Sequence, residues 1–112
     1  MRGLLASLVA AALISIPAPA FAQEEVPPDT VIQAALDAAS AELGVPADNL
    51  LVVMTAQRDW SDSSLGCPEP GRAYAQVITP GFIVTIDTDD LATEIQVHTD
   101  RGSRAVICSS SF

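Results

Sequence analysis

The chain has 112 residues, of which five are lysine or arginine and fourteen are acidic, so its formal net charge at pH 7 is −9. All five basic residues are arginines, which excludes Schiff-base chemistry and nucleophilic catalysis by lysine. An acidic chain repels phosphate, and nucleic acid and anionic lipid are therefore poor partners. This length suits one small domain with a thin hydrophobic core.

The N-terminal region is typical of a secretory signal peptide. A positive start precedes an uncharged, mostly apolar run at residues 4–16, and an A-F-A cleavage site follows. The run is shorter than the ~20 residues of a spanning helix, which favours a signal peptide at 1–22 over an uncleaved anchor. Cleavage between Ala22 and Gln23 predicts a periplasmic or extracellular protein without membrane association after signal removal.

The mature chain opens with a polar, proline-containing lead-in at residues 23–28, which we expect to be mobile. An amphipathic helix follows, because apolar residues recur at helical spacing over residues 31–43. Asp29 or Thr30 offers an N-cap, and Gly44 supplies the stop signal.

Beyond the helix, the hydrophobic period changes to that of β-strands. The predicted strands, in chain order, span residues 50–59, 74–79, 82–87, 91–99 and 104–108. Pro80-Gly81 fits the centre of a type II turn, which predicts a hairpin at 79–82. Because short turns force antiparallel neighbours, residues 29–112 are expected to form one α+β domain. In it, an N-terminal helix packs on a curved antiparallel meander of four to five strands.

Cys67 and Cys108 are the only cysteines, and in an exported chain they predict one disulfide. Closing a loop of about 40 residues stabilises a chain by about 4 kcal/mol in the chain-entropy description. Two free thiols or a metal pair are the alternatives. Two cysteines and one histidine fall short of a closed zinc site, so we expect neither a metal nor a cofactor.

The loop at residues 60–74 and the predicted hairpin form a candidate recognition surface. Long loops in small domains are often functional, and amphipathic aromatic residues anchor many binding surfaces. Trp60 is the best candidate for an exposed contact, since it lies where a strand becomes a loop. That the aromatic residues instead cover the edge of a thin core remains open. The candidate surface comprises Trp60, Asp62, Ser64, Tyr74, Gln76 and Phe82.

Signals for catalysis and metal binding are weak. The acids and hydroxyls of "WSDSS" and "DTDD" lack the regular spacing of a calcium loop. His98, with Asp100 nearby, lacks a nucleophile elbow and is interpreted as a surface histidine that caps a turn. We therefore predict no catalytic residue and no enzyme activity, with a hydrolase or metal enzyme as the third choice of function.

Two stretches of the chain resemble a known family, and they are "WSDSSLGCPEPGRAYAQVITPGF" and "IQVHTDRGSRAVIC". The order W-x-D-x-S-L-G-C-P-x-P-G-x-x-Y-x-Q-V-x-T-P-G is similar to a family of small exported bacterial proteins of uncharacterised function. The resemblance implies a secreted globular domain and carries no catalytic assignment.

A looser likeness is to helix-plus-meander folds such as PepSY and cystatin. Cystatins inhibit cysteine proteases with a Q-x-V-x-G hairpin, whereas here the valine directly follows Gln76 and the glycine comes one residue late, at Gly81. The leading hypothesis is a monomeric, non-enzymatic module that binds a protein or peptide. The alternative is a periplasmic protease inhibitor or protease-modulating domain.

Overall fold

A computed structural model describes residues 25–108 of the chain. The expected signal peptide, with its cleavage between Ala22 and Gln23, lies outside the described residues.

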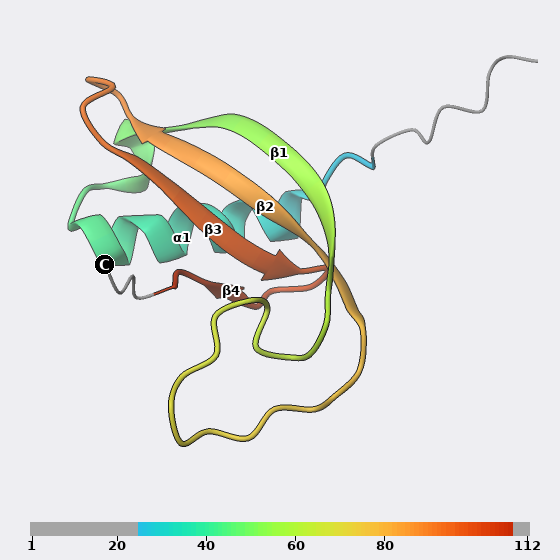
Figure 1. Cartoon of the computed structure of the whole chain (residues 1–112). Helices are drawn as coiled ribbons and strands as arrows, with labels where there is room; N and C mark the ends of the chain where they lie inside the picture. Colours follow the sequence, from blue (N-terminus) through green and yellow to red (C-terminus); the bar gives the residue numbers. More distant parts are fainter. Residues whose placement is uncertain (1–24, 109–112) are drawn as a thin grey trace, which may run out of the picture.

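Residues 25–108 form one α-helix packed on a four-stranded antiparallel sheet (Figure 1). The elements are α1 (Asp29–Leu43), the short 3-10 helix η1 (Ala47–Asn49), β1 (Leu50–Trp60), β2 (Thr79–Thr88), β3 (Glu94–Asp100) and β4 (Ala105–Val106). The strands lie in the order β1-β2-β3-β4, and each pairs with the next along the chain. This confirms the predicted α+β class and the meander.

The helix α1 packs closely against one face of the sheet. Val31, Ala35 and Ala39, spaced four residues apart, have no exposed surface. Alanine has no side chain beyond Cβ, so Ala35 and Ala39 allow the helix to lie close to the strands. Gly44 ends the helix in the left-handed conformation, as predicted, with a φ of 67°. No helix in the described part of the chain is long and apolar enough to cross a membrane.

The core lies between α1 and the central strands. Phe82, Val84 and Ile86 alternate along β2, and Val97 is opposite Val84 on β3; all four side chains are fully buried. The opposite face of the sheet has no second layer of helix in residues 25–108. Figure 1 shows the long connection between β1 and β2 extending past one end of the sheet, close to β4.

The predicted strand at 74–79 is wrong except for its last residue. β1 continues to Trp60, which pairs with Thr79, so β2 begins only there. Residues 74–78 form no strand because they belong to the loop that returns the chain to this pairing.

The predicted hairpin at 79–82 is also wrong, since Pro80 and Gly81 lie inside β2 and pair with β1. Pro80 is tolerated because the pairing of β2 with β3 starts one residue later, which leaves Pro80 a neighbour on one side only. Gly81 is needed for a close approach: a Cβ there would lie 1.8 Å from the carbonyl oxygen of Thr99. The same two residues that suggest a turn therefore allow a tight strand pairing.

Phe82 was a candidate surface residue, and its full burial predicts a structural role instead. Phe82→Ala is expected to lower the free energy of unfolding by about 3–5 kcal/mol, because it leaves a cavity beneath α1. Urea unfolding with an unchanged m value measures this loss. The control is Ile78→Ala, at a side chain that is 72% exposed, which should change stability by less than about 0.5 kcal/mol. Equal effects of the two substitutions would contradict the core assignment.

Candidate functional site

Trp60 ends β1 and lies over β3. Its ring stacks on His98, with the ring centroids 4.5 Å apart and the planes at 20°. Its Nε1–H donates a 2.8 Å hydrogen bond to the carbonyl oxygen of Thr99. The side chain is only 5% exposed, so the prediction of an exposed Trp60 is wrong. A buried indole needs a partner for its N–H, and here the backbone of β3 provides one.

The loop after Trp60 turns back under the indole ring through two residues with positive φ. Leu65 is fully buried with a φ of 58°, and its carbonyl oxygen accepts a 2.7 Å hydrogen bond from Nδ1 of His98. Gly66 has a φ of 80°, and a Cβ there would lie 2.8 Å from Cζ3 of Trp60. Only glycine therefore fits between the loop backbone and the ring.

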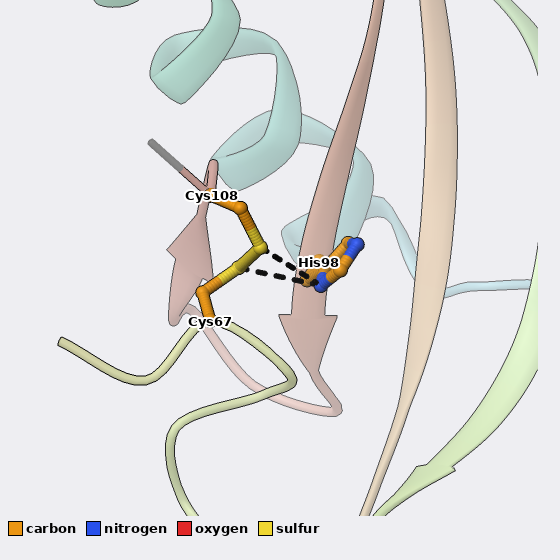
Figure 2. A group of neighbouring side chains, drawn as sticks. All are labelled: Cys67, His98 and Cys108. Atoms are coloured by element: carbon orange, nitrogen blue, oxygen red, sulfur yellow. Dashed lines mark hydrogen bonds between the residues drawn. A yellow bond between two sulfur atoms is a disulfide. The ribbon is translucent and has the colours of Figure 1, made fainter. Parts of the chain in front are cut away.

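The disulfide between Cys67 and Cys108 joins this loop to the segment after β4, which confirms the predicted pairing. The two residues are 41 positions apart in sequence, and their Cα atoms are 4.9 Å apart. Nδ1 of His98 lies 3.4 Å from Sγ of Cys67 and 3.8 Å from Sγ of Cys108 (Figure 2). The imidazole is thus held between the indole ring on one side and the disulfide on the other.

His98 is therefore the residue that sequence reasoning missed. It is half-buried at the centre of the cluster, so the interpretation as a turn-capping surface residue is wrong. Strand alternation carried a signal, since His98 follows Val97 and must lie on the opposite sheet face. Its neighbours come from positions far along the chain, and no local pattern could identify them.

Asp62 and Ser64 organise the start of the loop. The Asp62 carboxylate accepts hydrogen bonds from the Ser64 hydroxyl at 2.6 Å and from the Ser64 N–H at 2.9 Å. These two bonds, the hydroxyl first, lower the pKa of Asp62 below its ordinary value. Ser64 is buried, so its side chain serves the turn.

Tyr74, Gln76 and Phe82 do not form one surface with Trp60. The Tyr74 hydroxyl accepts a hydrogen bond from the N–H of Glu69, and the Tyr74 ring is half-buried. Gln76 is exposed, and its amide donates to the Tyr74 carbonyl oxygen. Phe82 lies in the core under α1. Of the six candidate surface residues, Gln76 alone is freely exposed.

A pocket of about 300 Å³ lies beside the disulfide. Its wall includes Cys67, Cys108 and the side chains of Tyr74, Arg72 and Arg104. The two guanidinium groups are already engaged, because Arg72 pairs with Glu69 and Arg104 donates to the Ser63 carbonyl oxygen at 2.7 Å. The pocket therefore gives access to the two half-buried cysteines.

The outer edge of β1 carries the most exposed apolar stretch of the described chain. Four consecutive side chains, Leu51 to Met54, have exposed fractions between 37% and 60%. β1 pairs only with β2 in residues 25–108, so its other edge presents unpaired backbone groups. A bulge between Val52 and Met54 interrupts the register here, but no charged residue interrupts the apolar run.

Comparison with known proteins places the chain in a family. A family model described as a domain of unknown function, DUF8738, matches residues 32–108. The chain belongs to the DUF8738 family. The matched range contains all of α1 except its first three residues, together with the sheet, the Trp60–His98 stack and both cysteines. No curated protein and no solved structure gives a significant match.

A substitution at Gly66 tests the close contact between the loop backbone and the Trp60 ring. Gly66→Ala is expected to destabilise the protein by about 2–5 kcal/mol, because it combines left-handed strain of about 1–2 kcal/mol with overpacking of about 1–3 kcal/mol. The matched control is Gly71→Ala, which has a φ of 81° but no atom within 4 Å of the added Cβ. The control should cost only the strain, so similar losses in urea unfolding would refute the tight contact at Gly66.

The contribution of Asp62 to stability should depend on pH. Because its folded pKa is lowered, the carboxylate stabilises the fold above pH 3.8, and this contribution disappears as the pH falls through the folded pKa. Asp62→Ala should therefore melt at a lower temperature than the natural protein at neutral pH, and the gap should close in strong acid. The exposed Asp89→Ala is the control for general charge removal. A gap that does not depend on pH would contradict this role.

Proposed function

We propose that this protein is an exported, non-enzymatic domain that binds an extended segment of a partner protein along the outer edge of β1. The observation that carries the proposal is the run of exposed apolar side chains on an edge strand with free backbone groups. Such edges bind peptides by strand addition, in which main-chain hydrogen bonds give affinity and alternate side chains give specificity. The disulfide and the signal-like N-terminus support export.

The charges around the edge define the partner. Leu51 is opposite Asp87 on β2, so one carboxylate lies next to the apolar run. The described chain carries a large excess of acidic over basic residues. A segment with alternating apolar and basic side chains is complementary to this surface. A second copy of the chain would bring acid against acid, which favours a monomer that binds a different protein.

The loop at 60–74 supports this surface rather than forming it. Trp60 fixes the end of β1 against β3, and the disulfide fixes the loop beneath Trp60. The protease-inhibitor alternative uses the same loop together with a projecting hairpin at 79–82, and the residues of that hairpin lie inside β2. No observation favours that alternative over strand addition.

A direct test uses a fluorescent decapeptide of alternating valine and lysine and measures its anisotropy with the oxidised protein. We expect binding to this peptide and none to a valine–glutamate peptide of equal length. Met54→Lys should weaken binding at least about tenfold, because roughly 1.5 kcal/mol of apolar burial is lost and like charges meet. The matched control, Ile78→Lys, adds the same charge to an exposed apolar residue away from the edge and should bind normally.

Other outcomes overturn the proposal. Equal binding by Met54→Lys and the natural protein would exclude the β1 edge, as would equal binding of a peptide whose central proline removes a backbone N–H. A dimer in light scattering would assign the edge to a second copy. Stoichiometric inhibition across a panel of cysteine and serine proteases would support the inhibitor alternative.

A further inference from the structure

We propose that Cys67, His98 and Cys108 form a zinc(II) site when their disulfide is reduced. The three ligand atoms, two Sγ and Nδ1, lie within 4.8 Å of one another, and each residue is half-buried. The site is separate from the β1 edge and does not depend on the proposed peptide binding. Zinc binding by the protein would then depend on whether its surroundings reduce the disulfide.

The two nitrogen–sulfur distances already fit a shared zinc ion, whereas the sulfur–sulfur distance does not. Zinc binds thiolate sulfur at about 2.3 Å and imidazole nitrogen at about 2.0–2.1 Å, so tetrahedral ligands place sulfur and nitrogen about 3.5 Å apart. In the structure, Nδ1 of His98 lies 3.4 Å from Sγ of Cys67 and 3.8 Å from Sγ of Cys108 (Figure 2). The separation between the two sulfur atoms has to increase, which reduction permits. The Leu65 carbonyl oxygen, 2.7 Å from Nδ1, also has to move away from the lone pair that would bind zinc.

The ligands remain positioned without the covalent bond. The ring of His98 stacks on Trp60, and β3 holds its backbone. The loop that carries Cys67 is attached through the Trp60–Thr99 hydrogen bond and through Arg104, which donates to the Ser63 carbonyl oxygen. These contacts keep the loop beside β3 in the reduced chain.

The reaction balances with a dithiol as the reductant. The dithiol transfers two electrons and two protons to the Cys67–Cys108 bond, becomes a disulfide itself and leaves two protein thiols. Zinc(II) then displaces the two thiol protons and binds both thiolates. Nδ1 of His98 donates to the Leu65 carbonyl oxygen in the oxidised chain, so its proton must move to Nε2 before Nδ1 can bind the metal.

A site with two thiolates and one imidazole leaves one tetrahedral position open. The pocket of about 300 Å³ reaches both cysteines, so water can supply the fourth ligand. Two cysteines and one histidine do not by themselves close a zinc site. The geometry instead points to an open site that exists only in the reduced protein.

The experiment compares oxidised and anaerobically reduced protein, titrated with zinc(II) alone against a chromophoric chelator. We expect one zinc per reduced chain, bound at least about 100-fold more tightly than by the oxidised chain. The oxidised protein is a matched control because it keeps every surface carboxylate and differs only at the sulfur atoms. Cobalt(II) in place of zinc should give a thiolate charge-transfer band with the reduced protein and none with the oxidised one.

Variants test the three ligands separately. Cys67→Ser, Cys108→Ser and His98→Gln should each weaken zinc binding by about 100-fold or more, since even the loss of an outer-shell partner costs about 10–100-fold. His98→Cys should restore binding, which a purely structural role of His98 would not predict. Zinc affinity that is the same in oxidised and reduced protein, or unchanged in His98→Gln, overturns the proposal.

Unfolding of the reduced chain would not prevent the test. Zinc(II) should then refold the reduced natural protein, with Trp60 fluorescence reporting burial of the indole ring, and should not refold the three ligand variants. Failure of zinc to refold the reduced chain also overturns the proposal.

Discussion

The packing of Trp60 against β3 is the contact on which the rest of the structure depends. The indole ring covers His98, and its N–H donates to the Thr99 carbonyl oxygen, 39 positions away in sequence. This contact fixes the end of the edge strand and provides a surface under which the loop can turn. Because the loop passes tightly beneath the ring at Gly66, the next residue, Cys67, comes within bonding distance of Cys108. The disulfide is therefore a consequence of the stack as well as a support for it.

Local chemistry predicted the fold class well. The helix followed from apolar spacing and the glycine at position 44, and the disulfide followed from two cysteines in a chain that was expected to be exported. The errors arose where local signals have two physical meanings. Pro80-Gly81 is a good turn sequence, yet Gly81 permits close contact with the Thr99 backbone and Pro80 lies just before β2 gains its second neighbour. Which meaning applies depends on the length of β1, and that length is a property of the whole sheet.

The candidate site was harder to predict than the fold, because its members come together only in three dimensions. The aromatic side chains expected at the surface are mostly enclosed, and Trp60 and Phe82 occupy opposite sides of the sheet. Phe82 belongs to the core under α1, whereas Trp60 is buried on the other face of the sheet against His98. His98 becomes important through the residues that surround it. The local sequence around each of those residues predicts only an ordinary loop or strand position.

Stability and exposure are divided between the two ends of β1. At one end, the stack, the loop and the disulfide bury the strand terminus. At the other end, Leu51 to Met54 remain open along a part of the edge without the charged side chains that usually block edge-to-edge pairing. In the proposed binding mode, the acidic character of the chain would take over part of that protective role, because two copies of like charge repel each other. That repulsion does not act against a basic segment, so the same charge would favour the partner proposed above.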